Sequence, residues 1–190
     1  MIAGAAELFA RDGFENVSLE QIGEAVGISK AGVYHYFRAK QEILDEIVLT
    51  TLDGLTEAVT AATAAAALPR ERLVAFMTAH ADYFERNYWA FTAMLVGFGG
   101  IRSPAPRGAV VGQRDRYEAL LRRIIADGIE RGDFREVDVA TASRAVLSLL
   151  NWMARWYDPN GSERAAAFAA GYVELLLDGI GARPRSRRDA

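Results

Sequence analysis

The sequence has 190 residues, of which 51% are hydrophobic, and its formal net charge is −3. This length allows one large or two small domains with a sizeable core, and the slightly negative charge means that affinity for nucleic acid has to come from a local patch. The absence of cysteine excludes disulfides and thiol catalysis, and no stretch approaches the roughly 20 apolar residues that cross a membrane, so we expect a cytoplasmic protein without a membrane partner.

Alanine, leucine, glutamate and arginine dominate the sequence, and clusters of β-branched residues are sparse. This composition predicts an all-α protein. Apolar residues at helical spacing predict a first helix over residues 2–12 that ends at Gly13. We expect this helix to support the next two helices in an N-terminal domain of residues 1–40.

The stretch from Ser18 to Phe37 contains two short helical patterns separated by a glycine turn. Ser18 and Gln21 have the spacing of a capping box, so a helix should begin after Ser18 and end near the glycine at position 27. Ser29 then caps a second helix, Lys30 to Tyr36. Two helices joined in this way predict a helix-turn-helix.

The second of these helices carries the prediction of DNA binding. A helix fits the major groove of B-DNA, where its first turns meet base edges and phosphates. Residues 28–41 hold three cations and no carboxylate, which gives a local positive patch. The predicted DNA contacts are Ser18, Ser29, Lys30, Ala31, Gly32, Val33 (to a thymine methyl), Tyr34, His35, Tyr36 and Lys40. In the alternative interpretation His35 is a solvated surface residue and Tyr36 is a packing aromatic.

The rest of the chain is predicted as a helical domain of residues 41–180 and a basic tail of residues 181–190. The long helix 39–66 begins beside the DNA reader and links it mechanically to the C-terminal helical domain. We expect further helices over 70–86 and 89–98, a Gly/Pro-rich loop over 99–108, a helix that stops at Gly132, one capped by Asp138 that runs to Tyr157, and a last one capped by Ser162.

Aromatic and methionine residues are dense between positions 76 and 98, which a plain core does not require. A cavity between these helices would be apolar and elongated, with a few polar groups, and would suit a hydrophobic or amphipathic molecule. The candidate ligand-binding residues are Met77, His80, Tyr83, Phe84, Phe91, Met94, Phe98, Tyr117, Leu121 and Asn151. The alternative is that these side chains simply fill the core.

The last two predicted helices are apolar on more than one side. Surplus apolar surface of this kind is typical of a partner-binding face, so we expect a homodimer. The candidate interface residues are Leu147, Trp152, Arg155, Trp156, Phe168, Tyr172, Leu175 and Leu176.

The run FARDGFENVSLEQIGEAVGISKAGVYHYFRAKQEIL resembles the DNA-binding domain of the TetR family of bacterial transcriptional regulators. The resemblance covers roughly the first quarter of the chain and rests on the aromatic-plus-glycine corner from Phe9 to Phe14, the capped helix pair, and Tyr34, Tyr36, Phe37 and Lys40 at the signature positions. One departure is that family members usually have a basic arm before the first helix, whereas Ile2 already lies in that helix here.

The resemblance implies an N-terminal three-helix DNA-binding domain with a helix-turn-helix and a C-terminal helical ligand-binding and dimerisation bundle. In the family the final two helices pair with their copies, which places two reader helices about one DNA turn (~34 Å) apart on a near-palindromic operator. The phrase NWMARWYDPNGS resembles a subgroup whose effectors are acyl-CoA thioesters. It implies phosphate and adenine contacts from Arg155 and Trp156 with Arg102 or Arg107, although Trp152 and Trp156 as dimer anchors remain the alternative.

These features predict a homodimeric repressor that binds double-stranded operator DNA and is released by an apolar or acyl-CoA-type effector, with no cofactor or metal. An enzyme is the first alternative. Against it stand the two histidines, the lack of a Gly-x-Ser-x-Gly elbow, and the lack of a phosphate loop or paired-histidine metal spacing. A helical carrier of hydrophobic ligands without a DNA role is the second.

Overall fold

The protein is described by a computed structural model for residues 1–97 and 104–179, and these residues form helices and no strand. The all-α prediction is therefore confirmed over this part of the chain. The helices are α1 (Ile2–Asp12), α2 (Leu19–Ala25), α3 (Lys30–Tyr36), α4 (Lys40–Ala64), α5 (Pro69–Arg86), α6 (Tyr88–Gly97), α7 (Pro104–Glu130), α8 (Val139–Trp152) and α9 (Ala165–Asp178), with short 3₁₀ turns η1 (Phe14–Asn16) and η3 (Met153–Arg155).

The helix-turn-helix forms as its caps predict. The Ser18 hydroxyl accepts a hydrogen bond from the Gln21 backbone N–H at 3.2 Å, and the Ser18 N–H donates to Gln21 Oε1 at 2.8 Å. Ser29 Oγ accepts from the Gly32 N–H at 3.2 Å and so caps α3. Gly27 takes the positive φ of 70° that the turn needs. Helices α2 and α3 thus begin and end where local sequence chemistry places them.

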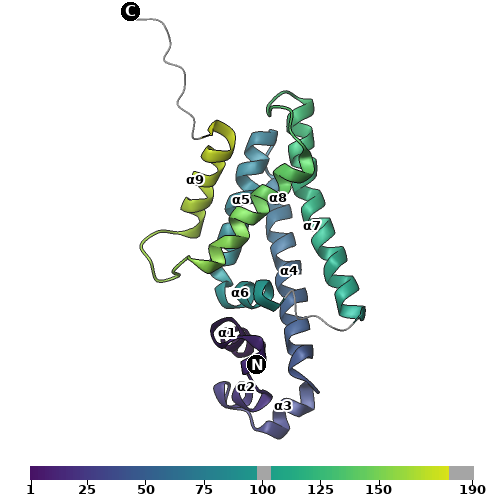
Figure 1. The fold of residues 1–190 in the computed structure, drawn as a ribbon, viewed down its shortest axis with the longest axis vertical. Coiled ribbons are helices and arrows are strands. Elements are labelled where there is room, and N and C mark those ends of the chain that lie inside the picture. The colour runs from purple at the N-terminus through teal and green to yellow at the C-terminus, as the bar shows by residue number, and fades with distance from the viewer. Residues whose placement is uncertain (98–103, 180–190) are drawn as a thin grey trace, which may run out of the picture.

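Two elements connect the small domain at the bottom of Figure 1 to the larger bundle above it. Helix α4 runs from α3 up into the bundle, and its buried stripe includes Ile43 and Leu44 near one end and Val59 near the other. Helix α6 packs against both α1 and α4. Gly97 permits this closeness, because a Cβ added there would lie 2.6 Å from a Leu44 methyl. A movement of α6 would therefore act on the reader domain through its contacts with α1 and α4.

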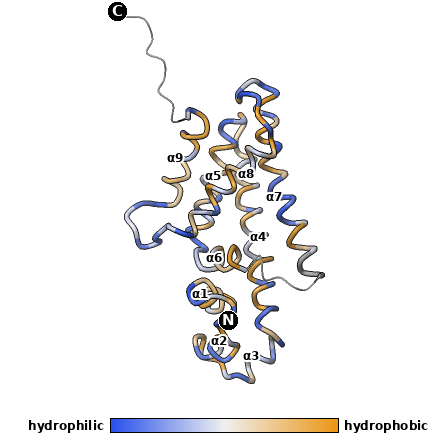
Figure 2. The backbone as a smooth tube through the Cα atoms, in the orientation of Figure 1, coloured by the Kyte–Doolittle hydropathy of each residue, from blue (hydrophilic) through white to orange (hydrophobic). Residues whose placement is uncertain are grey.

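Helices α5, α7, α8 and α9 make up the upper bundle. Helix α9 lies along α5 (Figure 1) and buries Ala165, Ala169 and Val173, residues spaced four apart on one face. Figure 2 shows that α9 is nevertheless hydrophobic over most of its length. More apolar surface is present on α9 than α5 covers.

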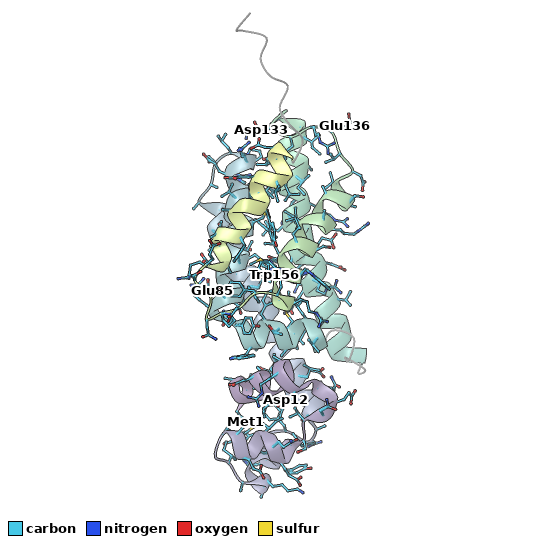
Figure 3. The ribbon with its side chains drawn as sticks, turned by 60° about the vertical axis from the view of Figure 1, so that its left-hand side comes forward. Met1, Asp12, Glu85, Asp133, Glu136 and Trp156 are labelled. Carbon is cyan, nitrogen blue, oxygen red and sulfur yellow. The ribbon has the colours of Figure 1, made fainter. Side chains whose placement is uncertain are left out.

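Three predicted boundaries are wrong. The helix capped by Asp138 ends at Trp152 and not at Tyr157, because the chain continues as the 3₁₀ turn η3. The loop predicted over 99–108 is shorter at its C-terminal end, because α7 begins at Pro104, and proline is well tolerated in the first turn of a helix. The last helix is not capped by Ser162: it begins at Ala165, whose N–H donates to Glu85 Oε2 of α5 at 3.3 Å. Figure 3 labels Glu85 near the lower end of α9. A carboxylate distant in sequence has replaced the local cap.

Candidate DNA-binding interface and effector site

Helix α3 lies at the lower extremity of the molecule, where its outer face is open (Figure 1). Tyr34 and Tyr36 expose 48% and 68% of their surface, and Ser29, Lys30, Ala31 and His35 are exposed beside them. The His35 and Tyr36 rings contact each other edge to face, with centroids 5.1 Å apart. The structure thus brings most of the predicted DNA-contacting side chains onto one accessible surface.

Val33 is an exception to this arrangement. Its side chain is fully buried beside α2, where a Cβ added to Gly23 would lie 3.0 Å from a Val33 methyl. Val33 therefore belongs to the core of the helix-turn-helix, and the predicted contact with a thymine methyl is wrong. Gly32 also has a packing role, because a Cβ there would meet an Ile28 methyl at 2.6 Å.

Lys30, at the N-terminus of α3, forms an ion pair with Glu20 of α2. The hydrogen bond to Glu20 raises the pKa of Lys30, and both side chains are more than half exposed. Exposed pairs of this kind are weak and are screened by salt. A DNA phosphate at the start of α3 would compete with Glu20 for the Lys30 ammonium, so Lys30 remains the candidate phosphate contact.

Lys40 is hydrogen-bonded within the reader domain. Its ammonium donates to the carbonyl oxygens of Phe14, Glu15 and Val17 at 2.7, 3.0 and 3.0 Å, and it lies 4.6 Å from the centroid of the Phe14 ring. These three acceptors use all the protons of the ammonium group. Lys40 therefore ties the corner between α1 and α2 to the start of α4, and the predicted phosphate contact would require it to give up one of these carbonyls.

Seven of the predicted ligand-binding residues come together in the upper bundle. Six of them belong to the buried hydrophobic core, namely Met77, Phe84, Phe91, Met94, Tyr117 and Leu121. The seventh, His80, is buried against the rings of Phe91 and Tyr117 and completes one cluster with them. Their rings are in contact, with centroid separations of 5.2 Å for Phe84 and Phe91 and 5.3 Å for His80 and Phe91. Tyr83 is only partly buried at the edge of the cluster. Phe98, Arg102 and the basic tail 181–190 lie outside the described residues. The prediction that these residues share one region is supported. In this structure, however, their side chains fill that region by packing against each other.

One polar pair lies inside this cluster. His80 Nδ1 is 2.7 Å from the Tyr117 hydroxyl, and the two residues expose 1% and 5% of their surface. Burial lowers the pKa of His80 to about 3 and raises the pKa of Tyr117 well above its ordinary value. Both groups are therefore neutral at physiological pH.

Asn151 is not in this cluster but lines a separate groove of about 510 Å³. The groove is bounded by α1, α6, α8 and η3, and its lining includes Ala10, Trp89, Thr92, Asn151, Trp152 and Arg155. Sequence reasoning missed the contribution of α6. This helix is apolar around its whole circumference, so its pattern did not indicate which side faces a groove.

A second groove of about 620 Å³ lies at the other end of the bundle. Residues of α5, α7, α8 and α9 and of the connection between α7 and α8 line it, among them Leu73, Phe134, Val146 and Leu176. None of the predicted ligand-binding residues that the structure describes borders it. One predicted interface residue, Leu176, does.

The predicted interface residues share an outward-facing position on α8, η3 and α9. Trp152, Trp156, Leu175 and Leu176 expose 65%, 42%, 49% and 38% of their surface, which is much for large apolar side chains. Trp156 contacts Phe168 of α9 with ring centroids 5.0 Å apart, and Arg155 lies 5.9 Å from the Trp152 ring. Leu147, Phe168 and Tyr172 are partly buried beneath them.

Two family models match this chain and together cover most of it. Residues 1–47 match the model described as bacterial regulatory proteins, tetR family, and residues 66–180 match the one described as tetracyclin repressor-like, C-terminal domain. The chain belongs to the TetR family. It is accordingly a DNA-binding transcriptional regulator, and the helix-turn-helix described above is its reader.

Similar proteins are known for this TetR-family chain over nearly its whole length. The HTH-type transcriptional repressor KstR2 of Rhodococcus jostii is 28% identical over 93% of this chain and 87% of its own length. The crystal structure of the TetR regulator PfmR from Thermus thermophilus is 48% identical, with a TM-score of 0.89 over 95% of this chain and 98% of that one. AibR, crystallised with isovaleryl coenzyme A and operator DNA, shares the fold at 24% identity, with a TM-score of 0.81 over 93% and 95%.

Substitutions at the two lysines of the TetR reader domain are expected to have opposite effects on stability and on the salt dependence of operator binding. Lys40→Met leaves three carbonyls without their donor, so we expect the free energy of unfolding to fall by about 2 kcal/mol, with the salt dependence of operator binding unchanged. Lys30→Met should leave stability unchanged and reduce the slope of log affinity against log salt concentration by about one. Urea unfolding and operator binding at several salt concentrations measure both. A reduced slope for Lys40→Met would restore its predicted phosphate role.

Within residues 1–97 and 104–179 of this TetR regulator, no helix combines the length and the hydrophobicity that a membrane span needs.

Proposed function

We propose that this TetR-family chain is a homodimeric repressor that leaves its operator when an acyl-CoA binds in the groove between α1, α6, α8 and η3. The proposal rests on the position of this groove. It joins Ala10 of the reader domain to residues of the upper bundle, so a molecule that fills it touches both parts of the protein.

The chemistry of the groove suits the head of a coenzyme A thioester. Arg155 supplies a cation for phosphate, and Trp89 and Trp152 supply exposed rings on which an adenine can stack. Asn151 adds hydrogen-bonding capacity. The fold is compatible with such an effector, since AibR has been crystallised with one.

Release from DNA results if the effector prefers the arrangement that does not fit the operator. Helix α6 forms one wall of the groove and packs on α1 and α4. A bound head group would change how α1 rests on α6, and the reader would turn relative to α4. In the dimer this would alter the separation of the two α3 helices, which the operator fixes at about one DNA turn.

We assign the dimer interface to Trp156, Leu175 and Leu176 with the partly buried residues beneath them. The contacts support this assignment, because Trp152 and Arg155 line the groove whereas Trp156 packs on Phe168 of α9. An apolar face shared by α8, η3 and α9 is self-complementary under a two-fold axis.

Operator binding in the presence of acyl-CoAs tests the proposal. An operator is first selected from random duplexes, and its affinity is then measured with acyl-CoAs of four to sixteen carbons, free coenzyme A and free fatty acids. We expect at least one acyl-CoA to weaken binding tenfold or more, with Arg155→Gln raising the concentration required about tenfold and Arg123→Gln on α7 leaving it unchanged. Full retention on DNA at saturating acyl-CoA would refute the effector assignment. Equal release by free fatty acids would favour an apolar effector without coenzyme A.

A further inference from the structure

The buried pair of His80 and Tyr117 has an unused hydrogen-bonding position. His80 Nδ1 meets the Tyr117 hydroxyl at 2.7 Å, but His80 Nε2 has no hydrogen-bond partner among the described residues. This nitrogen is buried, and the Phe91 ring packs edge to face on the imidazole. Leaving a buried polar atom unpaired costs free energy, so a structural role alone does not account for a histidine here.

Counting protons decides which atom of the pair is unpaired. If the Tyr117 hydroxyl donates to Nδ1, the imidazole proton sits on Nε2 and one donor is left over. If Nδ1 donates to the hydroxyl instead, both the phenol proton and the Nε2 lone pair are left over. The first arrangement leaves fewer unpaired groups. His80 therefore presents a neutral N–H donor to an apolar interior.

Helix α6 lies between this donor and the groove. Phe91 contacts His80 on the inner side of the helix, while the next residue, Thr92, lines the groove. Thr92 Oγ1 is likewise buried and has no partner in the described part of the chain. Two buried polar atoms without a partner among the described residues therefore lie next to α6: His80 Nε2 in the cluster that Phe91 contacts, and Thr92 Oγ1 at the groove.

We propose that His80 Nε2–H is the recognition point for the carbonyl oxygen of the acyl group, with the chain beyond it packed among Met77, Phe84 and Met94. The inference rests on the proposed function and adds the chemical feature that is read, a carbonyl at the head of an apolar chain. Entry of the chain displaces Phe91 from the imidazole. Because Phe91 belongs to α6, the displacement is transmitted to α1 and α4.

A pair of probes that differ only in the carbonyl tests this recognition. Decanoyl-CoA carries the thioester carbonyl, and S-decyl-CoA is the corresponding thioether. We expect the wild-type protein to bind decanoyl-CoA at least tenfold more tightly by calorimetry. His80→Asn, which retains an acceptor for Tyr117 but nothing at the Nε2 position, should reduce this preference to about twofold. His80→Gln, which places an amide N–H near the Nε2 position, should retain most of it.

Operator binding without effector shows that each variant is folded. A preference that survives unchanged in His80→Asn would overturn the proposal, whereas a wild-type protein that binds both probes equally would overturn it directly.

Nitrogen-15 spectra of the histidine side chains separate this proposal from the coenzyme A assignment. The protein has two histidines, so His35→Gln identifies the His80 signals. The free protein should show the Nε2–H tautomer, and 2-decanone, but not decane, should shift the Nε2 resonance. If neither CoA probe binds but 2-decanone gives this shift, the coenzyme A assignment fails and the carbonyl anchor stands. An Nδ1–H tautomer, or no shift with 2-decanone, refutes the recognition of a carbonyl by His80, whether or not coenzyme A binds in the groove.

Discussion

Leu175→Glu is expected to convert the dimer to folded monomers and to weaken operator binding at least 100-fold. Leu175 exposes 49% of its surface on α9, beside the equally unpartnered Leu176. A carboxylate at the centre of an apolar two-fold interface is buried twice without a partner, once from each subunit. A monomer then binds each half-site separately and loses the gain of about 10²–10⁴ that linked binding provides. Sedimentation and operator titration measure the two effects.

Val111→Glu is the matched control for this change. Val111 exposes 45% of its surface, nearly the same as Leu175, but it lies on α7, across the bundle from α9 in Figure 1. We expect this variant to remain dimeric and to bind the operator normally. Should Val111→Glu dissociate the dimer while Leu175→Glu leaves it intact, the interface is on α7 and the assignment to α8, η3 and α9 is wrong.

Lowering the pH from 7 to 5 is expected to cost the wild-type protein about 2 kcal/mol of unfolding free energy per subunit that His80→Asn does not lose. Burial lowers the pKa of His80 to about 3 from its ordinary value of 6.5. Between these values the unfolded chain binds a proton at His80 and the folded chain does not, so stability falls as the pH falls through this window. The loss begins below pH 6.5 and is complete near pH 3.

Urea unfolding at pH 7 and pH 5 and at one protein concentration measures this difference, since dimer stability depends on concentration. Other groups also change protonation in this range, but they are common to both proteins and cancel in the comparison. His35→Asn, a change at an exposed histidine, controls for the substitution itself. If wild-type and His80→Asn proteins lose the same stability between the two pH values, His80 is not held neutral by burial.

The reader domain was largely predictable because its signals are local. The capping box at Ser18, the glycine at position 27 and the cap at Ser29 act over three or four residues, and each forms as predicted. The family resemblance of the same stretch is explained by these local constraints. The contacts that could not be predicted there are those of side chains whose partners are distant in sequence, such as Lys40, which reaches back to carbonyls 23 to 26 residues earlier.

The effector region was predictable in composition but not in geometry. Aromatic spacing indicated that His80, Phe91 and Tyr117 share a region, and they do. It did not indicate that they pack closely, or that Asn151 would line a separate groove with the outer side of α6. A helix that is apolar all round gives no periodic signal for its orientation, so only its neighbours determine which face is covered.

The amino-acid sequence by itself determined the helices, the caps of the reader, and the family to which the chain belongs, because these depend on residues a few positions apart. Only the tertiary structure decided that Val33 is core, that Lys40 ties a corner, that Glu85 caps α9, and that one nitrogen of His80 has no partner among the residues that the structure describes. Each of these depends on atoms from segments that are far apart in the chain, and the chain has to be folded before they meet.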